Sequence, residues 1–223
     1  MAKVDKALLK LALQTLYKST LEFNRLGGKN IDPQFAKSQE GLVLEEGVET
    51  ILGKLRKNNK EFVDGVIDTL VTASFRVMIS EGNDLITKEH TGVFNPDNKS
   101  INRLVGDLTT ALLDEEWLAV MEIAEDISYL MDGDTIANLY SVAESNMSKF
   151  VPVNMLPNPE DMCETIESEG RYTGVEYSVE KLSNGEDVYI FTATYDVKEK
   201  RAFDKPKIVK PTGFFKEPVL WVD

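Results

Sequence analysis

The stretches EEGVE at residues 45–49 and EFVD at residues 61–64 decide the fold expected for this chain. Each stretch places two carboxylates three residues apart, which puts them on the same face of a helix. Between them, the polar residues 57–60 (KNNK) predict a turn. The pattern therefore predicts two consecutive helices that pack as a hairpin and bring about four carboxylates together.

A cluster of this kind has a characteristic chemistry. Bare carboxylates repel one another and cost much free energy to desolvate, so they are tolerated mainly around a divalent cation. Ligands that are all oxygen select a hard ion, Mg²⁺ or Mn²⁺. Because Mg²⁺ held by carboxylates usually shares its coordination shell with substrate phosphates, the sequence indicates phosphate chemistry.

The composition argues against several kinds of binding site and partner. The net charge of −13 argues against binding of DNA or RNA through the phosphate backbone. A single cysteine excludes an intrachain disulfide and favours a reducing, cytoplasmic location, and a single histidine excludes a multi-histidine zinc site within one chain. No signal peptide and no apolar run long enough to span a bilayer is evident, so we expect no membrane partner.

Apolar periodicity predicts that most of the chain is helical. Helices are expected at about residues 5–26, 39–56, 61–78, 101–113, 116–131 and 135–150, with a long loop over 81–100. Gly47 and Gly53 weaken the second helix by roughly 1 kcal/mol each relative to alanine, and a close contact between helices would explain them. In the third helix, Asp68 shares the acidic strip, either as a supporting group of the carboxylate cluster or as a cap partner.

Residues 98–131 repeat the layout of a helix, a short acidic turn and a helix, which indicates a degenerate second helical unit. Its carboxylates are Glu122, Glu125 and Asp126. They would form a second metal cluster or, as the favoured interpretation, a structural remnant that faces solvent or the first cluster.

The last third of the chain has a different composition. Prolines at 152, 157 and 159 indicate a linker, and residues 176–181 and 187–195 alternate around Asn184-Gly185, a strong signal for a β-hairpin. The proline-containing segment 205–223 is expected to lie extended over the helical body. The predicted fold is mainly α, with an all-α helical bundle over residues 1–151 and a linker with a small β-hairpin extension over 152–223.

The acidic motif resembles that of the MazG-like family of all-α nucleoside triphosphate pyrophosphohydrolases, which is related to the dimeric dUTPases. Glu45-Glu46-x-x-Glu49 followed by Glu61-x-x-Asp64 carries the resemblance. The segment SNMSK at 145–149 and the tail with KPTGF at 210–214 are similar to phage-encoded members. The stretch 82–131 is longer than the simplest MazG-like unit requires, which leaves the substrate and the oligomeric state open.

The resemblance implies a role for each matching residue. Mg²⁺, or Mn²⁺, would be bound by Glu46, Glu49, Glu61 and Asp64, while Glu45 would complete the acidic shell or orient the attacking water. Asn146 and Lys149 would hold phosphate oxygens. The implied reaction is hydrolysis of a (deoxy)nucleoside triphosphate to the monophosphate and pyrophosphate, which would shape the nucleotide pool in the host cytoplasm during phage infection.

Other functions and assembly states remain open at this point. The alternatives are a pyrophosphatase for another nucleotide, such as phosphoribosyl-ATP or an alarmone, and a non-catalytic helical interaction module. The third helix carries apolar residues nearly all round from Phe62 to Phe75, which predicts a homo-oligomer, most simply a dimer. The second helical unit over 98–131 would instead supply this cover within one chain.

Overall fold

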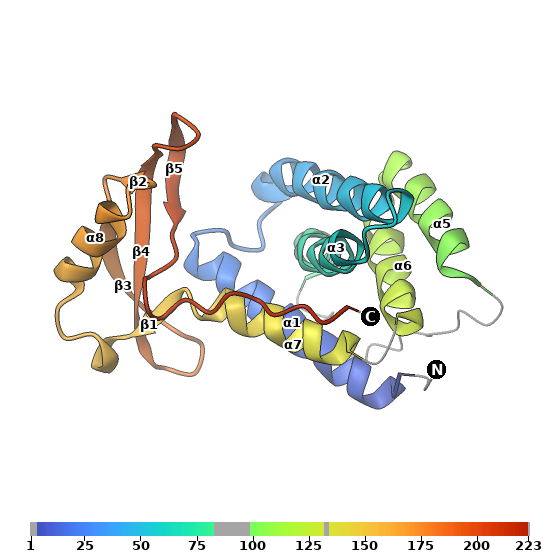
Figure 1. Ribbon diagram of the computed structural model, residues 1–223, viewed down its shortest axis with the longest axis horizontal. Helices are drawn as coiled ribbons and strands as arrows, with labels where there is room; N and C mark the ends of the chain where they lie inside the picture. The colour runs from blue at the N-terminus through green and yellow to red at the C-terminus, as the bar shows by residue number, and fades with distance from the viewer. Residues whose placement is uncertain (1–3, 83–98, 132–133, 223) are drawn as a thin grey trace. The chain divides into compact units, whose positions relative to one another are not determined.

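The computed structural model describes residues 4–82, 99–131 and 134–222. Internal contacts divide the chain into two compact units. The helical unit comprises Met1–Leu21, Lys29–Ala143 and Pro218–Asp223, and the sheet unit comprises Glu22–Gly28 and Glu144–Glu217. The described residues are mostly helical, with a small antiparallel sheet toward the C-terminus, as the sequence predicted (Figure 1).

The predicted helices are present, with ends that differ by a few residues. Most of the predicted loop over 81–100 lies outside the described residues. Side chains fix two of the helix starts, because Asn58 accepts a hydrogen bond from the backbone N–H of Glu61 and Ser100 accepts one from that of Arg103. The helices up to the sheet are α1 (Lys6–Leu26), α2 (Ala36–Leu55), α3 (Asn59–Glu81), α5 (Ile101–Leu113), α6 (Trp117–Leu130) and α7 (Thr135–Met147), with a 3₁₀ turn η1 (Pro33–Phe35) before α2.

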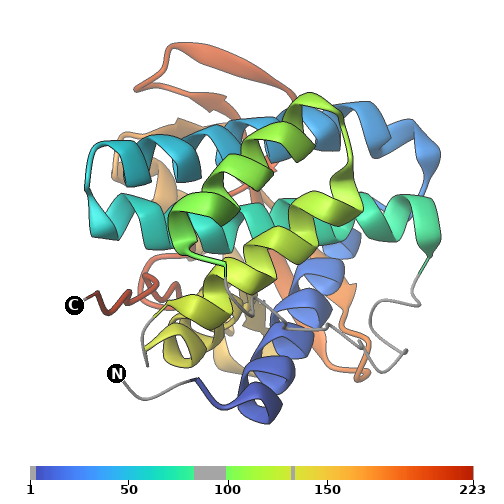
Figure 2. The ribbon, with the colours of Figure 1, turned by 90° about the vertical axis from the view of Figure 1, so that its right-hand side faces the viewer.

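Helices α2 and α3 form the predicted hairpin and lie side by side in Figure 2. A Cβ atom at Gly53 would lie only 2.6 Å from the backbone nitrogen of Phe62, and one at Gly65 would lie 2.8 Å from that of Thr50. The buried hydroxyls of Thr50 and Thr69 are 3.0 Å apart and share a hydrogen bond. The glycines therefore allow the two helix backbones to touch, which explains why α2 tolerates Gly53.

The core of the helical unit surrounds α3. Its side chains Val66, Leu70 and Phe75 are fully buried among residues of α1, α5 and α6. Figure 2 shows the α5–α6 pair beside the α2–α3 pair, and Leu112 of α5 reaches the surface of α2 at Gly47. The apolar residues of α3 are thus covered within one chain, so they no longer argue for an oligomer.

The sheet unit is larger than the predicted hairpin. Strands β3 (Glu176–Lys181) and β4 (Asp187–Asp196) confirm that hairpin, with Gly185 at a positive φ of 92° in its turn. In addition, β4 forms antiparallel pairs with three more strands. The helix α8 (Pro159–Ser168) packs on this sheet through Met162 and Ile166. The elements that the sequence did not predict are β1 (Phe150–Pro152), η2 (Val153–Met155), α8 (Pro159–Ser168), β2 (Tyr172–Thr173) and β5 (Arg201–Ile208).

The C-terminal segment belongs first to the sheet unit and then to the helical unit. Residues 205–217 belong to the sheet unit, the first four of them in β5, so the prediction that residues 205–223 lie extended over the helical body was wrong for residues 205–217. Residues from Pro218 onward belong to the helical unit, where the backbone of Trp221 bonds to Asn138 of α7. By internal contacts the chain passes from the helical unit to the main part of the sheet unit between Ala143 and Glu144, before the boundary at 151/152 expected from composition.

The close contact in the hairpin makes opposite predictions for two glycines of α2. Gly53→Ala should lower the free energy of unfolding by about 2 kcal/mol, because the new methyl group meets backbone that cannot rotate away. Gly41→Ala is the matched control: a Cβ there meets no atom within 4 Å, so the substitution should raise stability by up to about 1 kcal/mol through helix propensity alone. Urea unfolding of both variants measures the difference, and equal effects would contradict a close contact between backbones.

Candidate functional site

The hairpin positions the acidic motif. Helix α2 carries Glu45, Glu46 and Glu49, and α3 carries Asp64 and Asp68. On each helix these residues recur at intervals of three or four, so each set occupies one side of its helix. The backbone contact near Gly53 and Gly65 brings the two acidic sides together.

Glu46 is the centre of this group. It is half-buried, whereas Glu45 and Glu49 are exposed. Burial and the negative charges of Asp68, Glu49, Glu45 and Asp64, in that order of effect, raise the pKa of Glu46 from 4.5 to about 7. The negative charges of these four acids therefore act on Glu46, whereas Glu61, which the sequence placed in the same cluster, is not among them.

Asp64 and Glu61 differ from Glu46 in their surroundings. Partial burial raises the pKa of Asp64, while the positive charge of Lys60 opposes that rise. Glu61 lies in the first turn of α3, with Oε2 at 4.0 Å from Nη1 of Arg56, and both side chains are exposed. Asp68, whose role the sequence left open, has the largest electrostatic effect on Glu46 among the neighbouring acids. Its position four residues after Asp64 was the signal available in the sequence.

The side chains of this group do not converge on one point. Among the described residues, no three Asp, Glu, His or Cys side chains lie close enough together to hold a metal ion. The chemistry of the donors nevertheless fits a hard divalent cation, because all of them are carboxylates and their mutual repulsion raises the pKa of Glu46. Metal binding by Glu46, Glu49, Glu61 and Asp64 stays a prediction.

Asn146 and Lys149 lie in the sheet unit, at the end of α7 and just after it. Nζ of Lys149 donates a hydrogen bond of 3.2 Å to Oδ1 of Asn146 and lies 4.6 Å from the centre of the Phe23 ring. The two side chains thus contact each other. These contacts also give Lys149 a local structural role, and binding of phosphate oxygens by this pair stays a prediction.

In the second group of carboxylates, Glu122 is exposed, as a group that faces solvent should be, and Asp126 is half-buried, whereas Glu125 does not have the position that the sequence suggested. Glu125 is only 2% exposed, and the hydroxyl of Tyr17 donates a hydrogen bond of 2.5 Å to its Oε1. Burial and the charges of Glu122 and Asp126 raise the pKa of Glu125 to about 7, against the opposing effect of the Tyr17 bond. Glu125 therefore belongs to the core of the helical unit and faces neither solvent nor the first cluster. The position of Tyr17 within the apolar stripe of α1 was the signal for a buried polar partner.

Comparison of the chain with family models, curated proteins and solved structures gives no match. Among the described residues, no helix combines the length and the apolar character that crossing a membrane requires.

The raised pKa values predict how stability depends on pH. Glu46 and Glu125 have pKa values of about 7 in the folded protein, above their ordinary value of 4.5, so the folded state holds more protons than the unfolded state between these values. In the presence of chelator, the contribution of these two groups to the free energy of unfolding should be full at and below about pH 4.5 and should be lost as pH rises from there to about 7.

Urea unfolding across this pH range, on wild type, Glu46→Gln and Glu125→Gln, tests the assignment. Each substitution should make the free energy of unfolding depend less steeply on pH, because glutamine does not titrate. A slope between pH 5 and 7 that is unchanged in both variants would contradict the assignment.

Proposed function

We propose that this protein hydrolyses a (deoxy)nucleoside triphosphate to the monophosphate and pyrophosphate with the help of Mg²⁺. The observation that carries this proposal is the half-buried Glu46, which has the carboxylates of Glu45, Glu49, Asp64 and Asp68 as close neighbours. A solvated acidic face would spread such charges apart, since repulsion between them costs stability. An arrangement that instead concentrates negative charge at a helix contact favours a cation as the missing partner.

The carboxylates have different roles in the proposed reaction. Glu46, Glu49 and Asp64 would hold the cation, with Asp68 as a further or supporting carboxylate. Glu61 belongs to the same motif and would turn from Arg56 toward the cation. When bound, Mg²⁺ supplies positive charge that stabilises the charge developing on the phosphate oxygens.

The remaining residues act on water and phosphate. Glu45, exposed beside Glu46, would orient the attacking water. The water oxygen forms a bond to the α-phosphorus, the bond from that phosphorus to the bridging oxygen breaks, and pyrophosphate leaves. The motif SNMSK supports Asn146 and Lys149 as ligands of phosphate oxygens, where the amide donates a hydrogen bond and the ammonium group supplies a point charge. Control of the nucleotide pool during phage infection is the biological role that the family resemblance supports.

An apolar stripe on α2 supports assembly into a homo-oligomer. Leu44, Val48 and Leu55 recur at helical spacing and are 39%, 48% and 71% exposed. Burial of such a stripe against a second copy would remove apolar surface from water. The same stripe is the feature that a non-catalytic interaction module would use, so activity measurements decide between the two functions.

The reaction class predicts specific products. Incubation with a panel of nucleoside triphosphates and Mg²⁺ should release a monophosphate and pyrophosphate in equal amounts, with no turnover in excess chelator. Chromatography of the products measures this. Release of a diphosphate and phosphate would contradict the proposed reaction. If no triphosphate is turned over, the function of a non-catalytic interaction module is favoured. Phosphoribosyl-ATP and alarmones belong in the same panel as alternative substrates.

The electrostatic environment of Glu46 predicts an order of importance among the acids. Glu46→Gln and Asp68→Asn should each lower kcat/KM by about a hundredfold or more, because each removes a charge from the centre of the cluster. Glu61→Gln should have a smaller effect, since Glu61 lies near Arg56 at the rim of the hairpin.

The matched control is Glu164→Gln, on the exposed side of α8 in the sheet unit. It should leave both kcat/KM and the melting temperature unchanged. Addition of Mg²⁺ should raise the melting temperature of wild type more than that of Glu46→Gln. A larger loss of activity in Glu61→Gln than in Asp68→Asn would overturn the order given above.

A further inference from the structure

A surface groove of the helical unit lies where the end of α2 and the turn before α3 meet the start of α5. It encloses about 460 Å³, which is in the range of small-molecule sites. The groove is lined by Gly53, Lys54, Leu55, Lys57, Asn59, Asn102 and Val105. Among the lining residues that the structure describes there are two lysines and two asparagines but no acid, which indicates an anionic ligand.

The turn beside the groove has an unusual charge for this chain. Residues 54–60 (KLRKNNK) contain four basic residues and no acidic one, although the net charge of the chain is −13. Arg56 lies 4.0 Å from Glu61, but no carboxylate in the described parts of the chain lies within ion-pair distance of Lys54 or Lys57. The two positive charges that line the groove are therefore available to a ligand.

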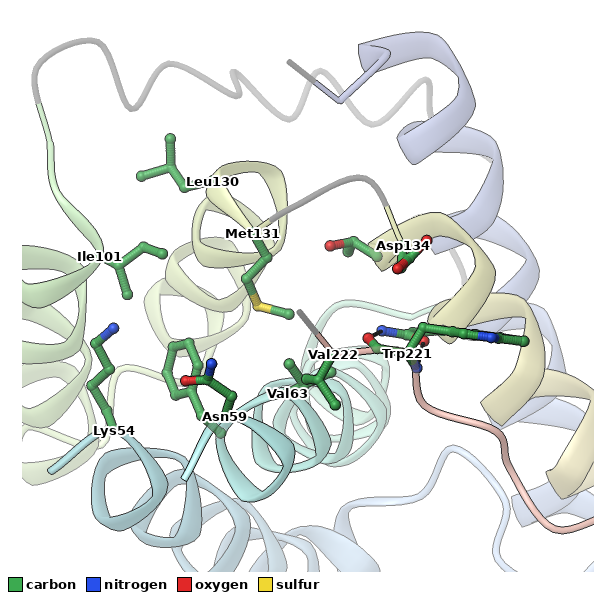
Figure 3. A pocket seen from close by; sticks show the side chains of 12 residues that line it. Lys54, Asn59, Val63, Ile101, Leu130, Met131, Asp134, Trp221 and Val222 are labelled. Atoms are coloured by element: carbon green, nitrogen blue, oxygen red, sulfur yellow. Dashed lines mark hydrogen bonds between the residues drawn. The ribbon is translucent and has the colours of Figure 1, made fainter. Parts of the chain in front are cut away.

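An aromatic ring holds one of these lysines at the edge of the groove. Lys54 is half-buried, and its Nζ lies 5.0 Å from the centre of the Phe62 ring. Figure 3, which draws a neighbouring pocket, shows this side chain reaching from the end of α2 toward Ile101, the first residue of α5. The ring attracts the ammonium group without cancelling its charge, so Lys54 remains a point charge for an anion.

The charge and the volume of the groove define the chemistry of its ligand. Lysine binds phosphate as a point charge, and the amide of Asn102 can donate hydrogen bonds to anionic oxygens. Asn102 also lies in the first turn of α5, where backbone N–H groups carry partial positive charge. A single phosphate would occupy only a small part of the groove, whereas linked phosphates bring several negative charges to the basic turn.

We propose that this groove binds an anion with two or more linked phosphate groups, held by Lys54, Lys57 and Asn102. The groove is separate from the carboxylate group, since Lys54 lies eight residues after Glu46, which is about 12 Å along α2. The proposal does not rest on the pyrophosphohydrolase activity, because it needs neither the metal nor the carboxylates. A free oligophosphate and the phosphate chain of a nucleotide share this chemistry, and different probes separate them.

Isothermal titration calorimetry tests the proposal in buffer freed of divalent metal by a chelating resin, at an ionic strength of about 0.15 M. Pyrophosphate and tripolyphosphate are the probes, and orthophosphate and citrate are the controls. At least one of the two probes should bind with an affinity about tenfold or more above that of either control. ATP carries the same phosphate chain as tripolyphosphate. Tighter binding of ATP assigns the groove to a nucleotide, and equal or weaker binding assigns it to a free oligophosphate.

Charge removal at the lining locates the binding. Lys54→Met and Lys57→Met each remove one charge and keep an apolar side chain, and each should weaken binding about tenfold. The matched control is Lys60→Met, which removes the same charge from the same turn at a residue outside the lining. It should weaken binding no more than about twofold, because solvent and salt screen its charge. Circular dichroism confirms that each variant is folded, and Lys57 is exposed, so its substitution disturbs no core packing.

The proposal is overturned if neither oligophosphate binds, if citrate binds as tightly as they do, or if the Lys54 and Lys57 variants behave like Lys60→Met. Lys149→Met separates this groove from the phosphate ligands of the proposed reaction and should leave binding unchanged. A loss of binding in Lys149→Met alone would place the anion at Asn146 and Lys149 and would likewise overturn the proposal.

Discussion

The contact between the backbones of α2 and α3 is the constraint on which the helical unit depends. Gly53 and Gly65 lie opposite Phe62 and Thr50, and neither position has space for a methyl group. Because glycine costs roughly 1 kcal/mol in a helix interior, these residues are unfavourable for each helix alone. They become favourable only through the approach that they permit, in which apolar side chains of α3 are buried and the hydroxyls of Thr50 and Thr69 meet.

The electrostatics of the candidate site follow from the same approach. Glycine lets the backbones of two helices touch. Side chains that one helix carries at the edge of this contact then lie close to side chains of the other helix. The acids at that edge are Glu46 on α2 and Asp68 on α3, and their repulsion together with burial raises the pKa of Glu46. A hairpin with larger residues at the contact would separate these carboxylates and weaken their interaction.

Two polar contacts inside the helical unit satisfy buried groups in pairs. Tyr17 and Glu125 share a hydrogen bond in the core, and Asn138 bonds to both backbone groups of Trp221. Such pairs are needed because a buried polar group without a partner costs about 1–3 kcal/mol. In the first case the pair joins two helices, and in the second it fixes the end of the chain to α7.

Local patterns in the sequence determined the helices, the β3–β4 hairpin and the acidic faces of α2 and α3. These features depend on periodicity and on turn residues such as Asn184-Gly185, which lie within a few positions of one another. Only the tertiary structure decided that β4 has further neighbours, since β1 and β2 join it from earlier parts of the chain. It likewise decided that Glu125 is buried, because helical spacing shows which residues share a face but not which partner that face meets. For the same reason the sequence indicated a carboxylate cluster, while the packing of two helices decided that Asp68 acts most strongly on Glu46.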